Sequence, residues 1–492
     1  MWFRRRLRRH RQVIPPGNPL YVNATTGDDA RSKAQARNSS SPWASIHRAY
    51  KGAAPGGGTV SSAAADAGDT IIVTDTTSAY NCYALNQNGF GGVALEPVNN
   101  GSVGAPIRLQ AADNAANKIK IQWGDTNRGA VLGGNTKSYL EYSGLILDET
   151  LLPPSIYDAP GNWSQASMVW LADCDHCLVE RSKFTGLNVP STEGINPNRT
   201  HDNYSAIRLH GSTGVGWSDI TIRDCHFTDW GVVSGGSHNN AGILWYFPGG
   251  AITVEYCLFE NSGNGMYWKG GSSTNNLVAA TVRNSHFRGN HINMALFVGA
   301  KGSSASPSMV YQNIMEAPVE TCIKMSNLGS ELPSHVKFVN NVICGGDYPV
   351  GIWGSWSAEG PLGFEFHNNI IRGGNFQRAY RDDAGGFSTT DLVATDFDFA
   401  NNVYTNCDPD VFVNLGANLS FSSWQGTYGY DTGGVLSTQT IFTNYAGQDF
   451  TLASSSPAIG VGRAKFGIGG TADAQINAGA YITGSETFGP RY

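Results

Sequence analysis

A repeat of 28 residues constrains the fold of this chain more than any other feature. Five apolar residues follow one another at this interval: Phe259, Phe287, Met315, Ile343 and Ile371. Each closes a copy of one short pattern, such as Val282-Arg283-Asn284-Ser285-His286-Phe287, and looser copies end at Phe184, Phe227 and Tyr404. A fixed period of this size indicates stacked repeats, because each repeat buries its apolar side only against its neighbours.

Side chains alternate within each copy of the pattern. One position is apolar in every copy, namely Val179, Ile222, Val254, Val282, Val310, Phe338, Phe366 and Phe399. The next position holds Glu180, Arg223, Glu255, Arg283, Tyr311, Val339, His367 and Ala400. Alternation with period 2 predicts a strand with the first set inside and the second outside. The alternating charges of Glu180, Arg223, Glu255 and Arg283 predict a ladder of ion pairs rather than catalytic acids and bases.

A column of small polar residues lies two positions before the closing apolar residue. Its members are Ser182, Cys225, Cys257, Ser285, Asn313, Asn341, Asn369 and Asn402. Stacked asparagines at a bend can hydrogen-bond from one repeat to the next. Cys225 and Cys257 therefore read as small buried residues. Cys174 and Cys177 read as packed thiols, because a structural zinc site needs a second pair of ligands.

A second strand follows each copy, and its outward residues form two columns. The first column is expected to hold Arg208, Leu244, Tyr267, Phe297, Lys324 and Trp353, and the second His210, Tyr246, Lys269, Gly299, Ser326 and Ser355. Equivalent strands of successive coils then lie side by side in parallel. The sequence predicts an all-β chain that forms a right-handed parallel β-helix.

Three segments resemble the pectate-lyase-like right-handed β-helix superfamily. The first combines Leu20-Tyr21-Val22-Asn23, Gly27-Asp28 and Ser41-Pro42-Trp43-Ala44-Ser45-Ile46, which look like that group's opening strand, turn and cap helix. Ala67-Gly68-Asp69-Thr70-Ile71-Ile72-Val73 looks like a first coil. Phe450-Thr451-Leu452, Ser456-Pro457-Ala458-Ile459-Gly460 and Asn477-Ala478-Gly479-Ala480-Tyr481 look like a closing segment. The resemblance implies the fold and leaves the function open, since the superfamily includes lyases, hydrolases, epimerases, adhesins and phage tailspikes.

These segments divide the chain into four parts. We expect a basic N-terminal docking arm over residues 1–19, an N-terminal cap over 20–66, a β-helix with loop insertions over 67–450, and a closing segment over 451–492. The arm carries Trp2, Phe3, Arg4, Arg5, Arg6, Arg8, Arg9 and Arg11. It lacks the apolar stretch that a signal peptide has after its basic start, so we interpret it as an arm rather than an export signal.

The remaining composition excludes two classes of partner. Only 15% of the residues are charged and the formal net charge is −6, which argues against a general nucleic-acid surface. No apolar run is long enough to cross a bilayer. The sequence therefore predicts neither a nucleic-acid partner nor a membrane partner.

The outward columns are the candidate binding surface. Rings beside cations along a long face suit an extended glycan, because rings cover the apolar faces of sugars and cations meet their carboxylates. The glycan-binding candidates are Arg208, His210, Tyr246, Tyr267, Phe297 and Trp353. The alternative is that a loop or a neighbouring subunit covers these columns.

Catalytic candidates come from the resemblance alone. In β-helix polysaccharide lyases a Lys or Arg removes the proton beside a uronate carboxylate, and another Arg or a Ca²⁺ ion neutralises the acid. By that resemblance Lys269 is the candidate base and Arg288 or Lys324 the candidate neutraliser. The alternative is that Lys269 is a solvated turn residue. No other cofactor is expected.

Other ionisable residues give weaker hypotheses. A glycoside hydrolase needs two carboxylates roughly 5–9.5 Å apart. The candidates are Asp224, Asp229, Glu260 and the pair Asp382-Asp383, and their spacing singles out no pair. His201, Asp202 and His238 read as solvated loop residues rather than metal ligands.

Two functions from different classes fit these observations. The first is a virion structural protein of a phage, a spike or a capsid or tail decoration. It would dock to other virion proteins through residues 1–16, form a homotrimer by resemblance, and bind cell-surface or capsular polysaccharide. The alternative is a secreted polysaccharide lyase or glycoside hydrolase that acts on an acidic polysaccharide. Whether the protein is an enzyme stays open at this point.

Overall fold

The computed structural model describes most of the β-helix and its two ends. The described residues are 17–82, 93–112, 119–123, 130–148, 167–186, 205–211, 218–231, 240–246, 250–269, 279–296, 303, 305–326, 334–353, 363–382, 397–407, 410–414, 417–427, 429–466, 468, 474–481 and 486–491. The docking arm proposed for residues 1–16 lies outside these ranges, as do His201, Asp202, His238, Phe297 and Asp383.

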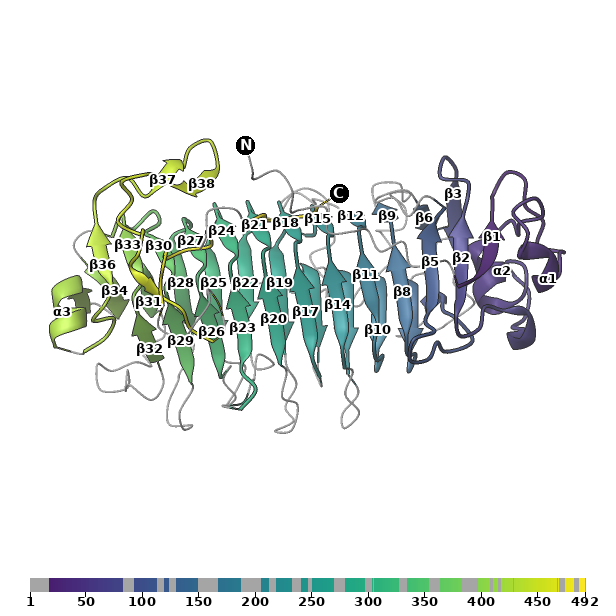
Figure 1. Cartoon of the computed structure of the whole chain (residues 1–492), viewed down its shortest axis with the longest axis horizontal. Helices are drawn as coiled ribbons and strands as arrows, with labels where there is room; N and C mark the ends of the chain where they lie inside the picture. The colour runs from purple at the N-terminus through teal and green to yellow at the C-terminus, as the bar shows by residue number, and fades with distance from the viewer. Residues whose placement is uncertain are drawn as a thin grey trace, which may run out of the picture.

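Three sheets of 12 strands run the length of the molecule (Figure 1). Sheet A contains, in order, β1 (Asn18–Val22), β2 (Asp69–Val73), β5 (Ile107–Ala111), β8 (Leu140–Ser143), β11 (Leu178–Glu180), β14 (Ile220–Arg223), β17 (Ile252–Glu255), β20 (Ala280–Arg283), β23 (Ser308–Tyr311), β26 (Val336–Val339), β29 (Phe364–His367) and β32 (Phe397–Ala400).

Sheet B contains β3 (Ala79–Cys82), β6 (Ile119–Trp123), β9 (Leu145–Asp148), β12 (Lys183–Thr185), β15 (His226–Thr228), β18 (Leu258–Glu260), β21 (His286–Arg288), β24 (Ile314–Glu316), β27 (Val342–Cys344), β30 (Ile370–Arg372), β33 (Val403–Thr405) and β36 (Val435–Ser437).

Sheet C contains β4 (Val93–Leu95), β7 (Ala130–Asn135), β10 (Ser167–Ala172), β13 (Ser205–His210), β16 (Ala241–Tyr246), β19 (Asn264–Lys269), β22 (Ile292–Leu296), β25 (Thr321–Ser326), β28 (Tyr348–Trp353), β31 (Tyr380–Asp382), β34 (Asp410–Asn414) and β35 (Ala417–Ser420). Neighbouring strands are parallel except for the last pair, β34 and β35. The chain visits sheets A, B and C in turn, which confirms the predicted right-handed parallel β-helix.

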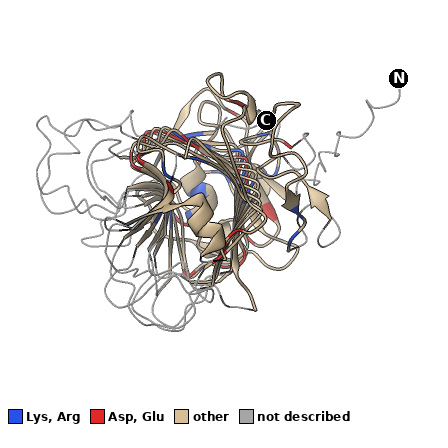
Figure 2. Cartoon of the chain, turned by 90° about the vertical axis from the view of Figure 1, so that its left-hand side faces the viewer, with Lys and Arg blue, Asp and Glu red and all other residues tan. Residues whose placement is uncertain are grey.

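Identical side chains stack from coil to coil in the core. The rings of Phe184, Phe227, Phe259 and Phe287 are nearly parallel, with successive centroids 5.0, 4.7 and 4.5 Å apart. These separations are close to the spacing of hydrogen-bonded strands. The repeat of 28 residues is therefore one coil of the helix. Looking along the stack, Figure 2 shows the strands of successive coils superimposed around this core.

The corner between sheets A and B carries the predicted ladder of buried asparagines. Asn341 Oδ1 accepts hydrogen bonds from the backbone N and from Nδ2 of Asn313, each at 3.0 Å. Asn369 and Asn402 continue the same pattern in the next two coils. The ladder ends at the carboxylate of Asp431, whose pKa is raised to about 6 by burial. Each step satisfies buried backbone donors that the bend would otherwise leave without partners.

Two further predictions from the columns are confirmed. Arg223 binds Glu180 at 2.7 Å and Arg283 binds Glu255 at 2.6 Å, so the alternating charges form an ion-pair ladder on the outside of sheet A. Cys174, Cys177, Cys225 and Cys257 are free, buried thiols, as are the other described cysteine side chains. These residues serve the architecture.

Helices close the two ends of the stack (Figure 1). At the N-terminal end lie α1 (Lys33–Ala36), α2 (Ile46–Lys51) and the 3-10 helix η1 (Ser61–Ala63), and the buried Trp43 donates its indole N–H to Arg31 O at 2.9 Å. At the other end α3 (Phe421–Gly426) inserts Trp424 against Phe412. None of the helices in the described ranges has the length and apolar character needed to cross a bilayer.

The C-terminal segment, residues 441–491, runs back along the outside of the helix (Figure 1). Its hairpin of β37 (Phe442–Asn444) and β38 (Asp449–Leu452) packs on the outside of sheet B, where Phe450 joins a cluster with Ile314 and Val342. Its hairpin of β39 (Gly462–Arg463) and β40 (Gln475–Ile476) covers the outside of sheet A. Arg491 then binds Asp224 through two nitrogens at 2.8 Å, five coils back from the coil of Asn368.

This covering changes one expectation from the alternation. Val339 and His367 point outward from sheet A, as predicted, but they are buried. Val339 packs with Ala464 and Ile476 of the C-terminal segment, and the ring of Phe466 stacks on His367. A repeat pattern describes the strand alone, so it does not reveal contacts with a distant segment.

The asparagine ladder predicts a large effect of a small truncation. Asn341→Ala is expected to lower the free energy of unfolding by ~3 kcal/mol, because the buried N–H groups of Asn313 lose their acceptor. Asn341→Ser is the control, since Ser285 fills the same column and accepts a backbone N–H at 3.1 Å. Its loss should be smaller. Chemical denaturation measures both, and equal losses for the two variants would contradict the role of the ladder.

Candidate functional site

Strand pairing fixes which residues are neighbours on the outer face of sheet C. Lys324 pairs with Ala295 in one neighbouring strand and with Gly351 in the other, and Arg381 follows Gly351. The prediction that Phe297 and Trp353 share the column of Lys324 is therefore wrong. Trp353 pairs with Ser326 instead. A shift of two residues leaves every side chain on its own face, so alternation alone cannot reveal it.

An early group of candidate residues surrounds Trp170. The guanidinium of Arg208 lies 5.7 Å from the centroid of the Trp170 ring, and the ring of His210 meets Trp170 edge-on at 6.2 Å. Arg208 is only 2% exposed. The pKa of His210 is lowered, first by burial and then by the charge of Arg208. His210, which is half-buried, is the member of this group more open to a ligand.

The middle of the same column is apolar packing. Leu244, Tyr267 and Ala295 are buried with Ala241 and Ile292 in a small cluster on the outer side of sheet C. Tyr267 is thus a packed side chain rather than an open platform. The side chains of Tyr246 and Lys269 lie outside the described part of the structure, although their strand positions pair with each other.

A charged network occupies the same face three coils further along the stack than Arg208. Lys324 Nζ lies 3.0 Å from Glu320 Oε1 and 4.6 Å from the centroid of the Trp353 ring. The other oxygen of Glu320 lies 2.9 Å from His291 Nε2. The pKa of Glu320 is lowered although its burial opposes this, because His291 and Lys324 both favour the carboxylate.

Trp353 folds back over the backbone of its own strand. A Cβ added to Gly351 would lie 1.9 Å from two atoms of the Trp353 ring, so the ring occupies the place of the side chain that Gly351 lacks. Gly351 is the residue between Lys324 and Arg381 in the column. The indole therefore lies on the outer face between these two cations.

Arg381 belongs to a second cation–aromatic group that adjoins the first. Its guanidinium lies 4.7 Å from the centroid of the Tyr348 ring, and Tyr348 stacks on Phe376 at 5.0 Å. Phe376 is 53% exposed, while Tyr348 is buried beneath its neighbours. We call the seven residues of the two groups the Lys324 cluster: His291, Glu320, Lys324, Tyr348, Trp353, Phe376 and Arg381.

Arg288 is placed in a different sheet from Lys269 and Lys324. It lies in β21 of sheet B, where it binds Glu260 at 2.6 Å and Gln448 of the C-terminal segment at 3.2 Å. Glu260 also binds His226 at 2.7 Å, and Asp224 binds Arg491. The structure brings Lys324, and the strand position of Lys269, to the outer face of sheet C, but not Arg288. Glu260 and Asp224, offered above as possible acids, belong to structural ion pairs.

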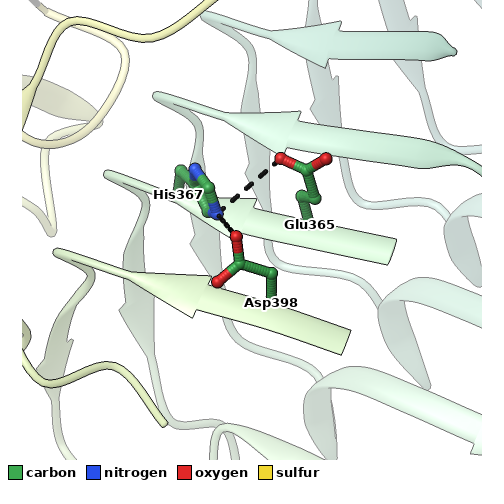
Figure 3. A group of neighbouring side chains, drawn as sticks. All are labelled: Glu365, His367 and Asp398. Atoms are coloured by element: carbon green, nitrogen blue, oxygen red, sulfur yellow. Dashed lines mark hydrogen bonds and ion pairs between the residues drawn. The ribbon is translucent and has the colours of Figure 1, made fainter. Parts of the chain in front are cut away.

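A second cluster has the composition of a metal site (Figure 3). Glu365, His367 and Asp398 meet on the outer face of sheet A, with His367 Nε2 2.9 Å from Asp398 Oδ2 and 3.8 Å from Glu365 Oε2. Lys337 binds Glu365 at 2.6 Å, and the charge of Lys465 lowers the pKa of Asp398 after the larger effect of His367. Two lysines already balance the two carboxylates. The cluster is therefore better explained as part of the clamp that holds the C-terminal segment.

Several residues of the Lys324 cluster were missed by sequence reasoning. His291, Glu320 and Tyr348 lie at the corner where sheet B passes into sheet C, and Phe376 and Arg381 lie in the first coil after the regular beat ends. One signal could have found Glu320, because it lies four residues before Lys324. Arg381 has no such signal, since only the strand register places it near Lys324.

No protein-family model and no curated protein matches the chain. Solved structures are nevertheless similar over nearly its whole length. The pectate lyase Pel9A superposes with a TM-score of 0.54 at 14% identity, covering 94% of this chain and 96% of that one. The chain has the pectate-lyase-like parallel β-helix fold.

Two other β-helix matches are weaker. XylC, solved with xylose, has a TM-score of 0.42 at 11% identity and covers 85% of this chain and 86% of its own. The PL6 polysaccharide lyase Pedsa3628 from Pseudopedobacter saltans has a TM-score of 0.40 at 13% identity and covers 87% and 96%. Likeness at this level concerns the fold, so function has to be argued from the site.

The ion pair of Arg288 predicts a pH-dependent stability. The pKa of Glu260 is lowered to about 2, chiefly by its hydrogen bond with His226 and also by Arg288. An unfolded Glu titrates near about 4.3, so the stabilisation is complete above that pH and is lost as the pH falls towards about 2. Glu260→Gln should therefore cost more stability at pH ~7 than at pH ~3.

Denaturant unfolding of the parent and the variant at both pH values measures this difference. Arg288→Gln is the companion variant, and it should also lose stability at neutral pH while leaving ligand binding on sheet C unchanged. Equal losses at both pH values, or loss of binding in Arg288→Gln, would contradict a structural role for this pair.

Proposed function

We propose that the protein binds an acidic polysaccharide along the outer face of sheet C and cleaves it by elimination. The Lys324 cluster carries this proposal. It combines two cations, Lys324 and Arg381, with the half-buried ring of Trp353 and the exposed ring of Phe376. Flat rings cover the apolar faces of sugars, and cations bind carboxylates.

The arrangement of the C-terminal segment supports the choice of face. In the late coils this segment packs on the outsides of sheets A and B. The Lys324 cluster lies on sheet C, which takes no part in either of those two clusters. Recognition of a long polymer fits this face, because successive coils repeat along it without a gap.

Elimination is favoured over hydrolysis because of the charges. In an elimination a base removes the proton on the carbon beside the carboxylate, the glycosidic C–O bond breaks, the departing oxygen takes a proton, and a C=C bond forms. The carboxylate must be neutralised for that proton to be acidic. Both contacts of Lys324 Nζ, a carboxylate and a ring face, attract a cation, so Lys324 suits the neutraliser rather than the base. Lys269 remains the proposed base.

The test uses a panel of acidic polysaccharides and a matched pair of variants. Lys324→Gln should weaken binding about tenfold or more, since it removes a charge-assisted contact. Lys337→Gln is the control, because Lys337 also binds a carboxylate, at 2.6 Å, and lies 3.9 Å from a ring centroid, but on sheet A. It should bind like the parent. Calorimetry gives the affinities.

The products identify the reaction. Ultraviolet absorbance of the new C=C bond, lost in Lys269→Gln, would support elimination with Lys269 as base. New reducing ends without that absorbance would mean hydrolysis. Binding without product would favour the glycan-binding virion role, which uses the same face without chemistry. If no acidic polysaccharide binds, or if both variants bind equally well, the proposal fails.

A further inference from the structure

We infer that the Lys324 cluster recognises carboxylates on alternate sugars of an extended 1→4-linked polyuronate, with the sugar between them lying on Trp353. This inference rests on the proposed function and adds the orientation and the spacing of the ligand. It places the polymer along the helix axis, across the strands, with one sugar for each coil.

The spacing of the two cations follows from the strand register. Lys324, Gly351 and Arg381 occupy one column in three consecutive coils, so Lys324 and Arg381 start two strand spacings apart. That separation is about 9.6 Å between their backbones. A sugar in an extended 1→4-linked ribbon advances by a distance close to one strand spacing. In such a ribbon alternate sugars present their carboxylates to the same side, so sugars one and three face the two cations.

The middle position of the column has no side chain of its own. Gly351 leaves room for the indole of Trp353, which lies over it on the outer face between the two cations. The second sugar of the ribbon turns its carboxylate away from the sheet, so it presents carbon-bound hydrogens to the ring. An aromatic ring between two cations therefore matches the alternation of the polymer.

The partners of Lys324 allow it to change its contact when a ligand arrives. Glu320 Oε1 accepts from Lys324 Nζ, while Glu320 Oε2 interacts with His291 Nε2 at 2.9 Å. Glu320 therefore keeps one partner when the ammonium turns to a substrate carboxylate. Arg381 is held by the face of Tyr348, which leaves the edge of its planar guanidinium as the part suited to a carboxylate.

The experiment compares β-1,4-linked glucuronate oligosaccharides of two to five units with cello-oligosaccharides of the same lengths. These two series differ only in the carboxylate. For the parent, the affinity for glucuronates should rise about tenfold between two and three units, when the second cation gains its partner, and little beyond. The neutral series should lack this step.

Variants locate the step in the structure. Lys324→Gln and Arg381→Gln should each remove it, so that two and three units bind equally. Lys337→Gln should retain it. Gly351→Ala keeps both cations but places a Cβ where the Trp353 ring lies, so it should weaken binding of three units and alter the near-ultraviolet dichroism of tryptophan.

The outcomes separate this inference from the proposed function. An even rise of affinity with length, a step at another length, or a step that persists in Lys324→Gln would overturn the alternate-sugar spacing while leaving acidic-glycan binding intact. The spacing is also overturned if the polysaccharide panel binds but no glucuronate oligosaccharide does. If neither the panel nor the oligosaccharides bind, the proposed function itself is overturned.

Discussion

Parallel hydrogen bonding between successive coils is the interaction on which the rest of this structure depends. It holds equivalent residues about one strand spacing apart, so a side chain that suits its place in one coil meets its own counterpart in the next. Stacked Phe rings, the asparagine ladder and the alternating Glu and Arg of sheet A are three results of that single constraint. The same constraint sets the spacing of Lys324 and Arg381 on the outer face.

The regular part of the fold could be read from the sequence, because it depends on neighbours in adjacent coils. Val254 in the core, Asn341 in the ladder and Arg283 in the ion pairs all follow from their columns. The register of sheet C could not be read, since Trp353 moved by two residues keeps its face. The burial of Val339 and His367 was equally hidden, because residues more than 100 positions later cover them.

The site was predictable in kind but not in detail. Lys324 and Trp353 were both expected on the outer face of sheet C, and the structure places them in contact there. Their partners Glu320, His291 and Arg381 come from a corner and from a coil beyond the regular beat. A position in a repeat identifies a face, whereas the geometry of a site depends on exceptions to the repeat. Gly351 is such an exception, because its missing side chain makes room for an indole.

The C-terminal segment changes how the molecule can fold and come apart. A plain solenoid is held by contacts between neighbouring repeats, so its end coils can fray one at a time. Here Asn368 bonds to Arg463, and Arg491 bonds to Asp224, so one strip of chain spans the coils between them. Fraying of any of these coils disturbs an anchor of the whole strip. The strip can dock only after those coils have formed, so its docking is a late event in folding that joins separate repeats into one cooperative unit.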